Sequence, residues 1–156
     1  MRSNLRNFLA RRVDKSKNRA AKNFVEVECD SITLYAQRVS EIIPKSESDY
    51  RSSGFVLKSS VERCLQLISD KQINILYALY SGTLRINGDY EALLRSSKFF
   101  DSALLQKVKS RKSLRNNLVH NYVEGEFDSE VFEHASDLSD VAEFVARAKE
   151  LSDSRR

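Results

Sequence analysis

Residues 59–79 have the sequence SSVERCLQLISDKQINILYAL, and this stretch decides the fold. Its apolar side chains recur every three or four positions, which is the spacing of one face of an α-helix. The pattern predicts a helix over about residues 54–80, long enough to face both a core and the seam of a dimer. The predicted stripe consists of Leu57, Val61, Cys64, Leu65, Ile68, Gln72, Ile75, Leu76 and Leu79.

The rest of the chain repeats this helical pattern. With only 4 Gly and 1 Pro, it lacks the turn formers that a many-stranded β fold needs. Pro44 ends the first predicted helix, and the polar residues 45–53 are expected to form a connection. We therefore predict an all-α protein, an antiparallel bundle of four or five helices. The predicted helices cover about residues 25–43, 54–80, 90–98, 102–122 and 130–148.

Positive charge is concentrated at the N-terminus. Residues 1–23 contain eight Lys or Arg and a single acid, Asp14, so the rest of the chain is net negative although the whole chain carries +4. The simpler interpretation is a solvated, partly disordered arm. The alternative is an arm that holds a phosphate backbone. We accordingly expect a basic arm over residues 1–23 and a helical domain over residues 24–152.

The composition argues against several other classes of protein. No run of 18 apolar residues is present, and the basic N-terminus lacks the apolar core of a signal peptide, so we expect no membrane partner. Cys29 and Cys64 are too few for a disulfide scaffold and are predicted to be buried thiols of a cytoplasmic protein. Two cysteines and two histidines, scattered this widely, predict no metal site.

One stretch carries the residues for chemistry: RKSLRNNLVHNY, residues 111–122. Four residues separate Arg115 from His120, Asn116 follows the arginine, and Tyr122 lies just beyond the histidine. On one straight helix Arg115 and His120 point about 140° apart, so they do not focus on one atom. Asn116 and His120 lie one turn apart, which would let the amide orient the imidazole.

The motif Arg-x4-His-x-Tyr, with Asn after the Arg and an aliphatic pair before the His, resembles the HEPN superfamily and within it the HepT-type ribonuclease toxins. The resemblance covers about residues 25–150. The long helix of that family has an arginine near its start, as at Arg63, and often has acids at the positions of Asp70 and Asn74. Asn74 departs from that pattern, so we assign it no role.

The resemblance implies a homodimer in which Arg115 and His120 of two chains converge and cleave RNA without a metal or other cofactor. Facing two copies of the motif across a two-fold axis would also overcome the 140° separation. A guanidinium suits the charge that develops on phosphorus, and an imidazole exchanges protons near neutral pH. The resemblance further implies that a partner nucleotidyltransferase antitoxin adenylylates Tyr122, adding charge and bulk that would block the cleft.

A basic run lies beside the motif, and no acid occurs between residues 102 and 119. In a domain that is otherwise net negative, such a run predicts a local RNA-binding patch. The alternative is a solvated helix face. The predicted RNA-binding residues are Lys107, Lys109, Arg111 and Lys112. By contrast, His134 has no companion motif and is predicted to lie on the surface.

Two other functions stay open at this point. A non-catalytic HEPN module would use the same cleft to bind nucleotide or RNA, or would serve as a dimerising scaffold. A generic helical-bundle interaction protein would carry the motif by coincidence. The intact set of Arg115, His120 and Tyr122 favours the ribonuclease, because a decayed site has no need of all three.

Overall fold

A computed structural model describes residues 2–80, 88 and 96–154, and all regular secondary structure in these residues is helical. The prediction of an all-α protein is therefore confirmed. None of the helices described is long and apolar enough to cross a membrane. The helices are α1 (Arg2–Ile42), α2 (Glu47–Arg51), α3 (Phe55–Tyr80), α5 (Ser102–His120), α6 (Asp128–Ser136) and α7 (Ser139–Asp153).

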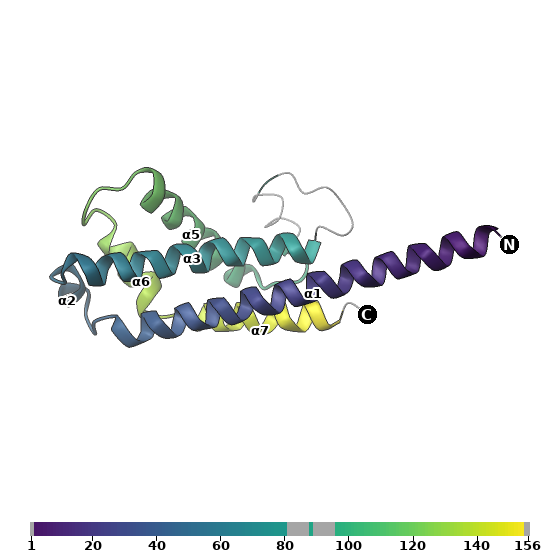
Figure 1. The fold of residues 1–156 in the computed structure, drawn as a ribbon. Coiled ribbons are helices and arrows are strands. Elements are labelled where there is room, and N and C mark those ends of the chain that lie inside the picture. The colour runs from purple at the N-terminus through teal and green to yellow at the C-terminus, as the bar shows by residue number, and fades with distance from the viewer. Residues whose placement is uncertain (1, 81–87, 89–95, 155–156) are drawn as a thin grey trace.

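The two longest helices, α1 and α3, lie side by side and form the most extensive helix contact of the bundle (Figure 1). Helix α7 packs along α1, while α5 packs against α3. The short helices α2 and α6 contact each other at one end of the bundle. At the opposite end, the N-terminal part of α1 extends beyond the other helices.

The apolar stripe predicted on the second helix faces the core of the bundle. It joins apolar side chains of α1, α5 and α7 in the larger core cluster, and those of α2, α5 and α6 in a smaller cluster. Full burial of one Leu or Ile side chain contributes about 1.5–3 kcal/mol, so this stripe is a major source of stability. The fully or nearly fully buried residues of α3 include Val61, Leu65, Ile68, Gln72, Ile75, Leu76 and Leu79.

Helix α1 is longer than predicted. The spacing of apolar residues predicted a start near residue 25, whereas the structure begins the helix at Arg2. No Gly or Pro interrupts residues 2–42, and the Lys, Arg and Ala residues of the basic segment are good helix formers. Helix propensity therefore extends α1 beyond the part that buries an apolar face.

The connection predicted over residues 45–53 contains helix α2, so that prediction was wrong. Ser46 caps the helix: its Oγ accepts a hydrogen bond from the Asp49 backbone N–H at 3.1 Å and donates one to Asp49 Oδ2 at 2.7 Å. The first of these bonds satisfies one of the backbone donors that a helix start leaves free. Tyr50 is buried and packs near Phe132, which ties α2 to α6.

The last predicted helix is divided into α6 and α7. Asp137 adopts an extended conformation between them, and its Oδ1 accepts a hydrogen bond from the Ser139 backbone N–H at 3.0 Å. Such a local side-chain bond competes with the helical hydrogen bonds and favours a break. Most of the helix predicted over about residues 90–98 lies outside the described residues.

Both cysteines are free thiols. Cys29 is buried in the core, and burial raises its pKa to about 11. Cys64 is only half-buried, in contrast to the prediction, because it lies at the edge of the α1–α3 contact. Burial also raises the pKa of the Cys64 thiol, so both cysteines are protonated at neutral pH.

Candidate active site on helix α5

Helix α5 carries most of the motif, and its two ends are well defined. Asp101 caps the start, since its Oδ1 accepts hydrogen bonds from the backbone N–H groups of Ala103 at 2.8 Å and Leu104 at 3.3 Å. The helix ends at His120, where Asn121 forms the C-cap. One face of the helix is buried, which holds the motif residues at fixed positions around its circumference. That face consists of Leu104, Leu105, Val108, Arg111, Leu114 and Leu118.

Arg115 lies beside this buried face and contacts α3. Its Nε is 2.7 Å from Asp70 Oδ1, and its side chain retains 26% exposure. Arg115 Nη2 also donates to Asp70, at Oδ2, over 3.4 Å. Its Nη1 donates to Asn116 Oδ1 at the same distance. The guanidinium is therefore oriented by an acid and an amide while part of it faces solvent.

His120 is exposed at the last position of α5. Within the residues described, no hydrogen bond links it to Arg115 or to Asn116. The Asn116 amide, predicted to orient the imidazole, instead contacts Arg115. A single chain thus presents both candidate catalytic groups on its surface without bringing them together, in agreement with their angular separation on one helix.

Tyr122 lies just after α5 and is half-exposed. Partial burial and the carboxylates of Glu62 and Glu124 raise the pKa of its phenol. Behind it, Lys58 Nζ and Asp128 Oδ2 form a largely buried ion pair of 2.6 Å. The Tyr122 hydroxyl is therefore protonated and accessible, beside a cluster that is net negative.

The acids near Tyr122 do not form a metal cage. Glu62 is nearly buried, and its burial together with neighbouring Asp128 raises the pKa of its carboxyl. Across the part of the chain that the structure describes, no three His, Cys, Asp or Glu side chains gather in a way that could hold a metal ion.

The sequence that forms α3 and α5 lies within the range of a known protein family. The family model described as Ribonuclease HepT-like matches residues 32–148, well over half of the chain. The chain belongs to the HepT-like ribonuclease family. The matched range includes Asp70, Arg115, His120 and Tyr122, whereas the whole basic segment, residues 1–23, precedes it. No curated protein matches the chain.

The basic run of this HepT-like chain does not form one continuous patch. Lys107 and Lys109 are exposed and Lys112 is half-exposed, but Arg111 is only 1% exposed. Arg111 Nη2 lies 2.9 Å from Asp140 Oδ2, and its Nη1 donates to Gln72 Oε1 at 3.2 Å.

The prediction that Arg111 binds RNA is therefore wrong. Arg111 follows Leu104 by seven positions and precedes Leu118 by seven, so helical periodicity places it on the buried face of α5. The sequence contained this signal, but the charge of the run obscured it.

His134 is another correction in this HepT-like chain, because it is buried rather than on the surface. It is 5% exposed, and its Nε2 lies 3.2 Å from Ser110 Oγ. Burial, followed by the nearby Arg111 charge, lowers the pKa of the imidazole, which keeps it neutral at neutral pH. Since the chain has two histidines, His120 is the accessible imidazole.

Asp70 is a site residue whose role was not predicted from the sequence. Its partner on α5 lies 45 positions away in the chain. A signal existed in the family resemblance, where acids are frequent at this position. Only the packing of α3 against α5 shows that the acid holds the motif arginine.

Proposed function

We propose that this protein is a metal-independent endoribonuclease, the toxin of a toxin–antitoxin pair whose antitoxin has the nucleotidyltransferase fold. Its site is formed at a homodimer interface by Arg115 and His120 of two chains. The observation that carries the proposal is the state of these two side chains: Asp70 orients a partly exposed Arg115, and His120 is exposed at the end of the same helix.

Arg115 binds and stabilises the scissile phosphate. A guanidinium has five N–H donors, and Asp70 and Asn116 occupy only some of them. Because the side chain keeps 26% exposure, part of the guanidinium can make charge-assisted hydrogen bonds to phosphate oxygens. Because the guanidinium is already oriented, little reorganisation is needed when charge develops on phosphorus.

His120 transfers protons, and two copies of it allow both transfers in one step. One neutral imidazole takes the proton of the RNA 2′-hydroxyl, and the 2′-oxygen attacks phosphorus. The bond to the 5′-oxygen breaks, and a protonated imidazole donates its proton to that leaving oxygen. The products are a 2′,3′-cyclic phosphate and a 5′-hydroxyl, and no metal or redox group is needed for the balance.

A second chain explains how Arg115 and His120 meet. They are about 140° apart on α5, so they approach each other only when two copies of the helix face across a two-fold axis. Lys107, Lys109 and Lys112 remain on the exposed part of α5, where they would contact the RNA backbone on either side of the cut.

Tyr122 provides the point of regulation. Its hydroxyl is accessible and lies two positions after His120, so an AMP group attached there by the antitoxin would add negative charge and bulk beside the cleft. Replacing Tyr122 by Phe removes the acceptor oxygen. The variant is expected to cleave RNA normally but to take up no label from radioactive ATP in the presence of the nucleotidyltransferase.

The test of catalysis uses purified protein, RNA and EDTA. We expect cleavage by the wild type, 2′,3′-cyclic phosphate ends, and a rate at least about 100-fold lower for His120→Ala, the usual effect of losing a general acid or base. Gln106→Ala is the matched control, because Gln106 is exposed on the same helix. Wild-type activity in His120→Ala would refute the catalytic assignment, whereas tight RNA binding without cleavage by the wild type would support a non-catalytic HEPN module.

A further inference from the structure

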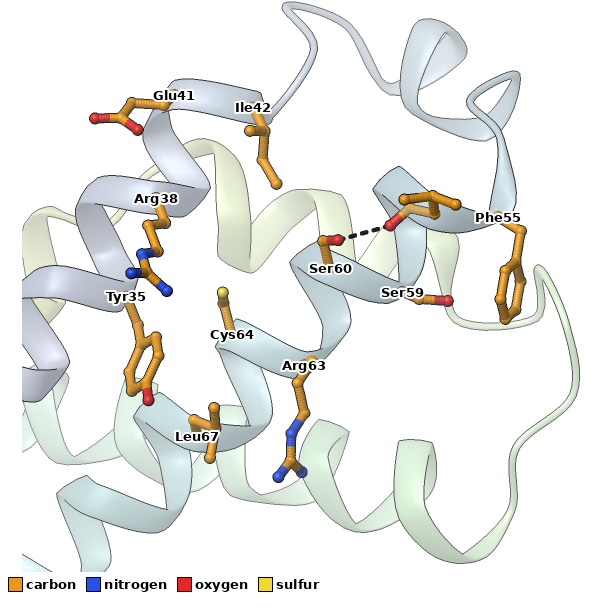
Figure 2. A pocket seen from close by; sticks show the side chains of 11 residues that line it. Tyr35, Arg38, Glu41, Ile42, Phe55, Ser59, Ser60, Arg63, Cys64 and Leu67 are labelled. Atoms are coloured by element: carbon orange, nitrogen blue, oxygen red, sulfur yellow. Dashed lines mark hydrogen bonds between the residues drawn. The ribbon is translucent and has the colours of Figure 1, made fainter.

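A groove between α1 and α3 is separate from the α5 motif. It has a volume of about 700 Å³, within the range of cavities that take small molecules or parts of larger ligands. Figure 2 shows side chains of α1 on one side of the groove and those of α3 on the other. Its lining is mainly apolar, with two arginines among the charged residues, Arg38 from α1 and Arg63 from α3.

The two arginines lack acidic partners. Among the described ion pairs and hydrogen bonds, Arg38 takes part in none, and Arg63 donates only to Gln66 Oε1, at 3.4 Å. Glu41 also lines the groove, but the hydrogen bond it accepts comes from Gln37. With two guanidiniums and one carboxylate in its lining, the groove has a net positive charge, which favours an anionic ligand.

The floor and one end of the groove are apolar and partly aromatic. Phe55 and Val56 begin α3 and are 68% and 78% exposed, respectively. Tyr35 lies toward the other end beside Leu67, and its ring is half-buried. Aromatic rings next to arginines are the combination that proteins use to bind unpaired nucleotides, with stacking for the base and a guanidinium for the phosphate.

Arg63 connects the groove to the candidate active site. It precedes Asp70 by seven positions on α3, so the two lie within about 20° on the same face and about 10 Å apart along the helix. Asp70 in turn holds Arg115. A strand with its phosphate at Arg115 therefore passes Arg63 before it reaches Arg38, which lies across the groove.

We propose that the α1–α3 groove binds an unpaired nucleotide of the RNA, farther along the strand from the phosphate that is cut. The base lies against Phe55 or Tyr35, and Arg38 and Arg63 hold the flanking phosphates. This inference rests on the proposed ribonuclease function and adds to it a preference for single-stranded RNA. The position of Arg63 on the same face of α3 as Asp70 and the net positive charge of the groove favour RNA over a protein segment or a second copy of the chain.

Cys64 allows a direct test, because it lines the groove and its thiol is half-buried, while Cys29 is fully buried and serves as an internal unreactive control. The His120→Ala protein, which leaves RNA intact, is treated with N-ethylmaleimide at mildly alkaline pH, alone or with a short single-stranded oligoribonucleotide. A blunt duplex of the same sequence is the comparison. Mass spectrometry measures labelling of Cys64, and fluorescence anisotropy measures RNA binding in the same samples.

We expect the single strand to slow labelling of Cys64 in proportion to its binding, and the duplex to protect it much less. Unchanged labelling while the single strand is bound would overturn the groove proposal but leave the proposed function intact. Protection that rises with protein concentration in the absence of RNA would also overturn it, because a second copy would then cover the groove. Failure to bind either RNA would contradict the proposed function as well.

Two substitutions test the roles of ring and charge. Phe55→Ala and Arg38→Gln are each expected to raise the Kd for the single strand by about tenfold, as loss of one stacking or phosphate contact does. Leu34→Ala and Lys98→Gln are matched controls, since both residues are exposed and neither lines the groove. Equal Kd values for the groove variants and their controls would contradict the proposal.

Discussion

Asp70 on α3 and Arg115 on α5 form an ion pair, with Arg115 Nε 2.7 Å from Asp70 Oδ1. Both side chains remain partly exposed, at 40% and 26% respectively, so water screens the attraction. A pair of this kind contributes at most about 1 kcal/mol to stability. Its importance is orientation, because it fixes the guanidinium on the side of α5 that faces α3.

Replacing Asp70 by Asn is expected to lower kcat/KM for RNA about tenfold, because a less firmly held guanidinium stabilises the transition state less well. The free energy of unfolding should change by less than about 1 kcal/mol. Cleavage rates and urea denaturation measure the two effects separately. Asp70→Glu, which keeps the charge, should recover part of the activity.

The matched control for this prediction is Asp30→Asn. Asp30 forms an exposed ion pair of similar length, 3.0 Å, with Lys149 on α7. It should change neither stability nor activity appreciably. If Asp70→Asn cleaves RNA as fast as Asp30→Asn, Asp70 has no positioning role.

Mixing two inactive variants tests whether the site is shared between chains. Arg115→Ala and His120→Ala should each be inactive alone, whereas their mixture should regain part of the activity, because a mixed dimer pairs the intact arginine of one chain with the intact histidine of the other but lacks the second imidazole. The variants are unfolded and refolded together, and cleavage is then measured. Mixed dimers detected by native mass spectrometry without any activity would show that Arg115 and His120 do not act across the interface in this way.

Arg111 is predicted to matter for stability rather than for RNA binding. Arg111→Met leaves Asp140 without its buried partner and removes a donor to Gln72, so unfolding should become easier by about 3–5 kcal/mol. Denaturation in urea measures this loss. Lys109→Met, a change of the same kind at an exposed position of the same helix, should instead weaken RNA binding and leave stability nearly unchanged.

His134 should make the protein less stable in acid. Its pKa is lowered in the folded state from an ordinary value of 6.5, so the unfolded chain binds the proton more readily. The contribution of neutral His134 to the free energy of unfolding is complete above pH 6.5. It is lost as the pH falls through the folded-state pKa of His134. In His134→Gln, the fall in stability below about pH 6.5 should be shallower than in the wild type.

Thermal unfolding at several pH values measures this slope. His120→Ala provides the comparison, because it removes an imidazole that is exposed at the surface. Identical slopes in His134→Gln and the wild type would mean that another group causes the loss of stability in acid.

The sequence by itself determined the fold class and the elements with strong periodicity. The stripe from Leu57 to Leu79 predicted α3 to within one residue of its start, since burial of one helical face imposes that spacing on the side chains. Local capping signals also act without tertiary contacts, as Asp101 does at the start of α5. The capping signal at Ser46 was equally local, but it was overlooked because it lies within the polar stretch of residues 45–53.

The motif residues could be named from the sequence, but their surroundings could not. Charge density suggested that Arg111 and Arg115 belong to one patch, and yet they lie four positions apart on a helix whose one face is buried. Arg111 enters the core against Asp140, whereas Arg115 stays at the surface against Asp70. Both partners come from other helices, 29 and 45 positions away.

Some features can be predicted from the sequence and others only from the tertiary structure, because the forces that produce them act over different ranges along the chain. Periodicity and capping arise from contacts within a few residues, so they can be recognised along the chain. The packing of α1, α3 and α5 decides which acid holds Arg115 and where Arg38 meets Arg63 across a groove. It also decides whether His134 is buried. These relationships exist only once the apolar faces of the helices have been buried against one another.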